Sequence, residues 1–212
     1  MQLKKNIIIN GAGLVGSLLA IYLAKRGHAI RLYERRPDMR LSGAIAGRSI
    51  NLALSDRGLN ALEKVGIADD IKKIAIPMHG RQIHNADGSQ VFQPYGAEGQ
   101  FINSVSRSEL NMQLMGIEEK NGIQLFFNHR CDTIDWKKNE VTYIHEVSGD
   151  TIRENADLIF GADGAFSASR LQHQIQSDRF EYQQTYINCG YKELSIPPTE
   201  NNEFAMEIHA LH

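Results

Sequence analysis

The chain begins with two short apolar runs that flank a longer one. Residues 7–9 and 29–33 are rich in β-branched and aliphatic side chains, as in buried strands, whereas residues 14–24 are apolar over the length of a helix. Gly27 follows two basic residues and is a natural helix end. The pattern predicts a strand, a helix and a second strand, which is a βαβ unit with two parallel strands.

The rest of the chain alternates short strands with a few helices. Ser55 is a suitable N-cap for an amphipathic helix, and Ser106-Arg107-Ser108-Glu109 is the capping box of another. Further strands are predicted at residues 48–54, 81–85, 90–93, 123–127, 132–136, 140–146, 151–154, 158–160, 187–196 and 204–209. We expect the strands between residues 123 and 154 to form a β-meander.

These elements predict the α/β fold class, with a Rossmann-like nucleotide-binding domain and a smaller β-rich domain. The composition changes at residues 74–95 and again after about residue 180. We therefore expect a discontinuous first domain at residues 1–73 and 99–178. An incomplete β-sheet domain at residues 74–98 and 179–212 would be interleaved with it.

Composition and charge narrow the possible partners. The net charge of −2 indicates no basic surface for nucleic acid or an anionic membrane. Residues 7–24 are uncharged, but their glycines and Asn10 fit a buried strand and helix better than a membrane segment or a signal peptide. Cys131 and Cys189 form no metal-ligand or disulfide pattern, so we expect a reducing, cytoplasmic location and no metal site.

Gly11-Ala12-Gly13-Leu14-Val15-Gly16 stands where the first strand gives way to the helix. In such a pattern Gly11 permits the tight turn, Gly13 lets the backbone approach a pyrophosphate, and Gly16 lets helix and strand pack closely. The helix N-terminus presents N–H groups and a partial positive charge to the phosphates. Glu34 ends the second strand, where a carboxylate accepts from a ribose 2′-hydroxyl and repels a 2′-phosphate. We expect FAD or NAD here, not NADP.

Three other positions each allow two interpretations. A hairpin that turns at Gly88 brings Arg81 near Tyr95, either to hold a small carboxylate ligand or to form a cation–π contact on a sheet face. Asp163 follows a strand in Gly161-Ala162-Asp163-Gly164, and it either accepts from a ribose or ribityl hydroxyl or starts a helix. Arg107 either faces a bound anion or is solvated.

Together these motifs resemble the FAD-dependent aromatic hydroxylases of the para-hydroxybenzoate hydroxylase type, and among them the kynurenine hydroxylases. The matching segments are residues 11–17, 33–36, 47–55, 76–78, 94–96, 104–107, 127–130, 161–165 and 191–194. The resemblance extends over nearly the whole chain. The segment at residues 48–55 is much more specific than the glycine motif, which many flavoproteins share.

The resemblance implies a GR2-type flavoprotein hydroxylase with one active site. FAD would contact Gly11, Gly13, Leu14, Val15, Gly16, Tyr33, Glu34, Arg35, Arg36, Ala53, Arg107, Cys131, Asp163 and Ala168. Arg81 and Tyr95 match the pair that holds the α-carboxylate of L-kynurenine, which makes the carboxylate interpretation of that pair the favoured one. No catalytic side chain is identified, because the chemistry belongs to the flavin.

The implied reaction converts L-kynurenine to 3-hydroxykynurenine, in tryptophan degradation and NAD biosynthesis, with NADPH and O2 as co-substrates. The family carries a second flavin motif later in its sequence, and Gly149-Asp150 followed by Thr151 does not match it. We therefore expect the N-terminal part of such an enzyme, inactive as a hydroxylase by itself. Two alternatives are another FAD-dependent aromatic-acid monooxygenase and a nucleotide-binding module without chemistry.

Overall fold

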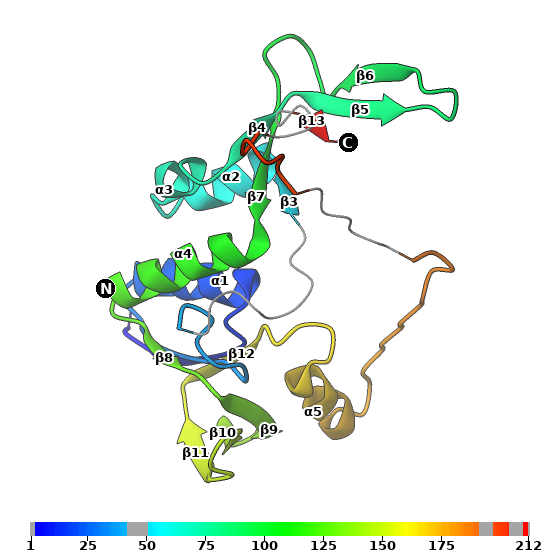
Figure 1. Cartoon of the computed structure of the whole chain (residues 1–212). Coiled ribbons are helices and arrows are strands. Elements are labelled where there is room, and N and C mark those ends of the chain that lie inside the picture. Colours follow the sequence, from blue (N-terminus) through cyan, green and yellow to red (C-terminus); the bar gives the residue numbers. More distant parts are fainter. Residues whose placement is uncertain (1–2, 42–50, 191–196, 204–209, 212) are drawn as a thin grey trace. The chain divides into compact units, whose positions relative to one another are not determined.

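The structure of the chain is a computed structural model that describes residues 3–41, 51–190, 197–203 and 210–211. The chain divides into two compact units (Figure 1). Unit 1 comprises Met1–Gly47 and Leu110–Thr185, and unit 2 comprises Arg48–Glu109 and Tyr186–His212. This division reports on packing alone, so the assignment of one domain to FAD and another to substrate stays a prediction.

Unit 1 is built on a four-stranded parallel sheet. The sheet has the order β12–β1–β2–β8, formed by β12 (Leu158–Gly161), β1 (Asn6–Asn10), β2 (Ala29–Tyr33) and β8 (Gln124–Phe126). The helix α1 (Leu14–Ala24) joins β1 to β2, which confirms the predicted βαβ unit. Ile7, Ile8 and Ile9 are almost completely buried, as expected for a central strand of a parallel sheet that is covered on both faces.

The prediction of a four-stranded meander is wrong in its first strand. β8 pairs in parallel with β2, so that Leu32 lies beside Leu125. The helix α4 (Arg107–Lys120) precedes β8 and provides the long connection that a parallel strand needs. The antiparallel sheet contains only β11 (Thr151–Asn155), β10 (Glu140–His145) and β9 (His129–Asp135), in that order.

A stack of three aromatic rings packs the parallel sheet of unit 1 against its antiparallel sheet. The Tyr33 ring lies 4.6 Å from the Phe126 ring on one side and 4.0 Å from the Tyr143 ring on the other. Burial raises the pKa of both tyrosine hydroxyls. Cys131, Ile134 and Val141 also belong to this hydrophobic core. The core therefore holds the end of β2 in place.

Unit 2 contains a small antiparallel sheet with two short helices. The sheet has the order β3–β7–β4, formed by β3 (Asn51–Leu54), β7 (Ile102–Ser106) and β4 (Ile76–Met78). The helices are α2 (Asp56–Glu63), which begins after Ser55 as predicted, and α3 (Ala68–Lys72). Leu62, Ile71 and Val105 are buried and form part of the core of this unit.

The predicted hairpin is present in unit 2, with a register two residues away from the predicted one. β5 (Gly80–His84) pairs with β6 (Gln90–Pro94), and β13 (Ala210–Leu211) pairs with β5 on its other side. The loop is closed by hydrogen bonds from Asn85 N–H to Ser89 O and from Gly88 N–H to Asn85 O. The turn is therefore centred on Asp87, and Arg81 pairs with Gln93 instead of Tyr95.

The end of the chain follows the prediction less well. The helix α5 (Ala168–Gln176) follows β12 as expected. Residues 187–190 form no strand, and the other residues of that predicted strand, 191–196, lie outside the described part, as do residues 204–209. Among the described helices, none has both the length and the apolar character needed to cross a bilayer.

Candidate functional site

The turn between β1 and α1, here called the glycine turn (residues 11–16), is shaped by two glycines that the fold itself requires. Gly11 has a φ of +100°, and a Cβ on it would lie 2.6 Å from the carbonyl oxygen of Ala162. A Cβ on Gly16 would lie 1.9 Å from the carbonyl oxygen of Gly11. A Cβ on Gly13 would meet no atom within 4 Å, so the space beside Gly13 is open to a ligand.

The helix that follows the glycine turn has an N-terminus suited to an anion. Gly13 is its N-cap and provides no side chain to satisfy the first N–H groups, and the first turn contains no acidic residue. Leu14 is half-buried and Val15 is 74% exposed. These features fit a pyrophosphate, which would accept from the N–H groups and be favoured by the helix dipole.

The Glu34 carboxylate lies against the glycine turn at the end of β2 and is 5% exposed. It accepts hydrogen bonds from the N–H of Ala12 at 3.0 Å and from the N–H and Nε of Arg36 at 3.0 and 2.8 Å. Burial raises the pKa of Glu34, but these hydrogen bonds outweigh burial and hold the pKa below its usual range. The carboxylate is charged, and the Arg36 side chain that binds it is 47% exposed.

The second predicted motif lies directly against the first. Gly11 packs against the backbone of Ala162 and Asp163. The Asp163 carboxylate accepts from the Ser167 hydroxyl at 2.6 Å and from the N–H of Ser169 at 3.0 Å, near the start of α5. These are the contacts of the helix-start interpretation, and the ligand interpretation of Asp163 stays a prediction.

Asn10 supports the glycine turn, a role that the sequence did not predict. Its side chain is buried, donates to the Ser169 hydroxyl at 3.1 Å and accepts from the Tyr143 hydroxyl. The sulfur of Cys131 lies 3.8 Å from the same amide nitrogen. A polar residue that ends an otherwise apolar strand is the feature of the sequence that could have indicated this role.

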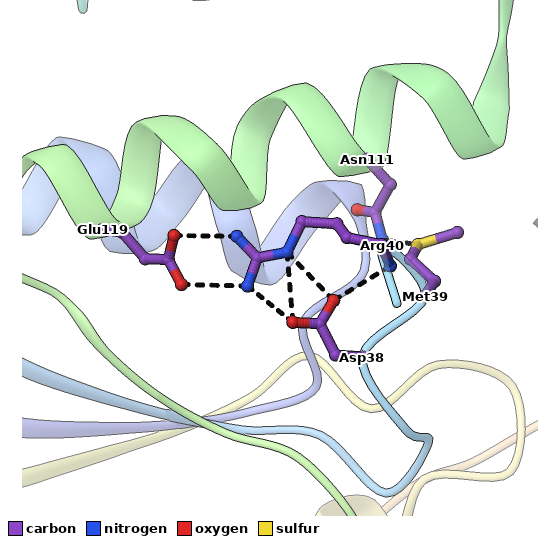
Figure 2. Close-up of polar contacts among 5 residues, drawn as sticks. All are labelled: Asp38, Met39, Arg40, Asn111 and Glu119. Atoms are coloured by element: carbon purple, nitrogen blue, oxygen red, sulfur yellow. Dashed lines mark hydrogen bonds and ion pairs between the residues drawn. The ribbon is translucent and has the colours of Figure 1, made fainter. Parts of the chain in front are cut away.

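A second support comes from α4 and was also not predicted (Figure 2). The Asn111 amide donates to the carbonyl of Ala12 at 3.0 Å. The Arg40 guanidinium binds the Asp38 carboxylate at 2.6 Å and the Glu119 carboxylate at 2.8 Å. These contacts attach the segment that follows Glu34 to α4, the helix that also binds the glycine turn through Asn111.

The other residues predicted to contact the cofactor differ in their access to a ligand. Tyr33 is 1% exposed, so it contributes to the glycine turn through its carbonyl, which accepts from Gly11 N–H at 2.7 Å. Burial raises the pKa of the Cys131 thiol to about 12, so the thiol is neutral. Arg35 is exposed, and Ala168 begins α5.

The remaining predicted residues belong to unit 2. The Arg81 guanidinium carbon lies 5.9 Å from the centre of the Tyr95 ring, which is a cation–π contact. Ala53 pairs with Ser104 across two strands, and Arg107 is exposed at the start of α4. Within the described ranges, no group of His, Cys, Asp and Glu side chains is arranged to hold a metal ion.

Comparison with known proteins gives similarities over the whole chain. Kynurenine 3-monooxygenase of Myxococcus xanthus is 46% identical over 211 residues, which are 99% of this chain and 45% of that protein. Kynurenine 3-monooxygenase of Flavobacterium psychrophilum is 42% identical over 214 residues, which are 100% of this chain and 47% of that protein. The chain thus spans about half the length of the curated relatives that it matches.

A solved structure, the tetrameric form of 2-methyl-3-hydroxypyridine-5-carboxylic acid oxygenase, has a TM-score of 0.65 and 24% identity, over 81% of this chain and 43% of that one. This likeness supports the α/β fold with a parallel sheet. The family model described as FAD binding domain matches residues 4–211. Because this match includes nearly every residue, the chain belongs to the FAD binding domain family.

Proposed function

We propose that the chain is the FAD-binding part of a flavin-dependent hydroxylase that converts L-kynurenine to 3-hydroxykynurenine with NADPH and O2. The observation that carries this proposal is the 46% identity, along 99% of the chain, to a relative named kynurenine 3-monooxygenase. FAD, when bound, supplies the transfer of electrons from NADPH and the activation of oxygen. The protein binds and orients the reactants and excludes water from them.

The adenosine half of FAD is assigned to unit 1. The N–H groups that follow Gly13 bind the pyrophosphate, and the charged Glu34 carboxylate accepts from the ribose hydroxyl groups. The same charge disfavours a 2′-phosphate, so NADPH would reach the flavin elsewhere. The open space beside Gly13 and the free N-terminus of α1 support this assignment.

The other assignments to FAD follow from the family resemblance. We assign Tyr33, Arg35, Arg36, Ala53, Arg107, Cys131, Asp163 and Ala168 to the border of the FAD site. Residues 1–73 and 99–178 would then form the FAD-binding domain, and residues 74–98 and 179–212 would contribute to substrate binding. The absence of a disulfide pattern supports a reducing, cytoplasmic location.

The substrate carboxylate is assigned to Arg81 and Tyr95. A guanidinium binds a carboxylate through two parallel N–H bonds, and a phenol can donate a third hydrogen bond. The 5.9 Å contact between the two side chains holds the guanidinium beside the phenol, and Arg81 is exposed. Both groups are therefore available to the α-carboxylate of an amino acid.

Two measurements test the proposal. FAD added to the purified chain should bind saturably, as followed by the change in flavin fluorescence. In the protein encoded by the whole reading frame that contains this chain, L-kynurenine should stimulate NADPH oxidation and yield 3-hydroxykynurenine. Stimulation by 4-hydroxybenzoate but not by kynurenine would favour another aromatic-acid monooxygenase, and an absence of FAD binding would contradict the whole assignment.

A further inference from the structure

The peptide group formed by the C=O of Ala12 and the N–H of Gly13, here called the Ala12 peptide, is bound by a side chain from a distant part of the sequence. The Asn111 amide nitrogen donates to the Ala12 carbonyl at 3.0 Å. Asn111 lies on α4 and is 6% exposed, so this hydrogen bond is shielded from water. The N–H of Ala12, on the preceding peptide group, is bound to Glu34 at 3.0 Å. Both backbone polar groups of Ala12 are therefore held by buried side chains.

The hydrogen bond from Asn111 sets the direction of the Gly13 N–H. The Ala12 peptide is trans, so its C=O and its N–H point in opposite directions. Because the carbonyl points towards Asn111, the N–H of Gly13 points away from Asn111. Among the backbone hydrogen bonds of the described turns and loops, none has this N–H as its donor. The N–H is therefore available to a ligand, at the same residue where a Cβ would meet no atom within 4 Å.

The Ala12 peptide needs a fixed direction because a glycine follows it. Gly13 has no Cβ, so a rotation of this peptide about its flanking bonds meets little steric resistance. A reversed peptide would present its partly negative carbonyl oxygen where the N–H now stands, and it would repel an anion. The Asn111 amide opposes this reversal, because its own N–H group would then face the N–H of Gly13 instead of a carbonyl oxygen.

A packing role alone does not account for an asparagine at position 111. The Asn111 Oδ1 is buried and has no hydrogen-bond partner among the described residues. An unpaired buried acceptor lowers stability, and leucine has a higher helix propensity than asparagine. The amide nitrogen also lies 3.4 Å from the sulfur of Met39, which is a weak acceptor (Figure 2). The bond to the Ala12 carbonyl is therefore the main polar contact that the structure describes for this side chain.

We propose that Asn111 is a positioning residue for the diphosphate of a dinucleotide and acts through the Ala12 peptide. It directs the N–H of Gly13 towards the phosphate oxygens and keeps the Ala12 carbonyl turned away from them. This inference rests on the proposed assignment of FAD to unit 1. It adds to that assignment a residue of α4 that lies outside the glycine turn and outside every segment that matches the hydroxylase family.

Titration of the purified chain with FAD, followed by flavin fluorescence, measures the effect on cofactor binding. Asn111→Leu should raise the Kd for FAD at least about tenfold. Met39→Leu is the matched control, because it removes the second contact of the same amide and nearly conserves volume. It should change the Kd by less than about twofold. Asn111→Ala is a second variant that adds no volume and should show the same loss, and urea unfolding of each variant checks that it is folded.

The amide resonance of Gly13 in nuclear magnetic resonance spectra reports on the Ala12 peptide without FAD. The Gly13 nitrogen shares its resonance-stabilised group with the Ala12 carbonyl, so Asn111→Leu should move the amide nitrogen resonance of Gly13 in the free chain. The resonance of Gly27, which is exposed at the other end of α1, should stay in place. Inorganic pyrophosphate should shift the Gly13 resonance saturably in the parent chain, with a Kd at least about fivefold higher in Asn111→Leu.

The outcomes separate this proposal from the proposed function. Equal binding of FAD and of pyrophosphate by the parent chain and Asn111→Leu would overturn the role of Asn111 and leave the hydroxylase function standing. Equal weakening by Asn111→Leu and Met39→Leu would also overturn it, because packing would then explain the loss. A parent chain that binds pyrophosphate with the expected dependence on Asn111, but does not bind FAD, would contradict the hydroxylase function and leave the role of Asn111 towards a diphosphate standing.

Discussion

The N–H of Ala12 donates to the Glu34 carboxylate at 3.0 Å, which ties the middle of the glycine turn to the end of β2. The same carboxylate is hydrogen-bonded to Arg36, so the glycine turn and the segment after β2 are both bound to one charged group. The position of Glu34 is therefore set by the protein before any ribose binds, which is the preorganisation that favours tight binding.

We predict that Glu34→Gln weakens FAD binding about tenfold or more, because a charged hydrogen-bond acceptor becomes neutral. The variant should also lose its discrimination against a 2′-phosphate, so that 2′,5′-ADP competes with FAD better than it does in the parent chain. Titration with FAD measures the first effect, and displacement of bound FAD by 2′,5′-ADP measures the second. Both are followed by flavin fluorescence. Glu63→Gln is the control, since Glu63 is 57% exposed in unit 2. Unchanged competition by 2′,5′-ADP would remove Glu34 from the ribose site.

Substitutions of Gly13 and Gly16 should distinguish an effect on FAD binding from an effect on folding. Gly13→Ala should keep the free energy of unfolding within about 1 kcal/mol, because a Cβ there meets no atom within 4 Å and the φ of −79° suits alanine. It should nevertheless weaken FAD binding at least about tenfold, since the methyl group occupies the space of the pyrophosphate. Gly16→Ala should instead prevent folding, because its Cβ would lie 1.9 Å from a carbonyl oxygen. Urea unfolding and FAD titration of both variants provide the measurements, and tight FAD binding by Gly13→Ala would contradict the assignment.

Glu118 on α4 is a fully buried carboxyl group, with an exposed fraction of 0%. Within the described residues, neither its carboxyl oxygens nor the hydroxyl of Ser17 has a hydrogen-bond partner. Burial raises the pKa of Glu118 from 4.5 to about 7, and the nearby Ser17 and Arg40 offset this only in part. Close to neutral pH the group therefore changes between its neutral and its charged form.

The sign of the pH dependence follows from this shift. Between pH 4.5 and about 7 the folded protein keeps a proton that the unfolded chain has released, so stability falls as pH rises through this window and then levels off. The expected loss is about 3 kcal/mol. Glu118→Gln keeps the shape of the neutral form and should flatten this part of the profile, as measured by urea unfolding between about pH 5 and about pH 8. An equal slope in parent and variant would show that other groups cause it.

Arg40 offers a test of the attachment between α4 and the segment after Glu34. Arg40→Met should lower the free energy of unfolding by about 1–3 kcal/mol, because two carboxylates lose charge-assisted hydrogen bonds. Arg40→Lys should recover little of this, since one ammonium cannot bind Asp38 and Glu119 through paired N–H groups. Arg130→Met is the matched control: its pair with Glu146 is exposed on both sides and should contribute less than about 1 kcal/mol. Equal losses in the two methionine variants would argue against a special role for Arg40.

Arg81 should act on substrate binding. In the protein encoded by the whole reading frame, Arg81→Met should raise the KM for kynurenine about tenfold to a hundredfold and change kcat less, because the carboxylate is bound equally before and during the reaction. Gln82→Met serves as the control, as its side chain points to the opposite face of the hairpin. A KM that does not change with Arg81→Met would place the substrate carboxylate elsewhere.

The parts of the fold that the sequence predicts well are those set by short-range spacing. Gly11, Gly16 and Glu34 form one site because a strand, a tight turn and a helix fix their separation, and each residue has a local physical reason for its type. The capping box at Ser106 is likewise local, and the N–H of Glu109 donates to its hydroxyl at 3.4 Å. The hairpin was predictable as a pair of strands, but its register depends on which loop residue is central, and Asp87 with its hydrogen bonds to Ser89 decides this.

The features that the sequence does not reveal depend on distant partners. Strand β8 has the composition of its antiparallel neighbours, and only the packing of α4 brings it beside β2. Glu118 lies in a charged run with Glu119 and Lys120 that is typical of a solvated helix face, yet it is buried.

The central position of β1 has a consequence for synthesis. Ile9 pairs with Leu32 on one side and with Phe160 on the other, and Asn10 binds Ser169. During synthesis, β1 leaves the ribosome well before Phe160 and Ser169 do. Pairing between strands so far apart in the sequence is slow. Cofactor capture should therefore follow the emergence of α5, and until then the apolar strand β1 lacks the partners that bury it.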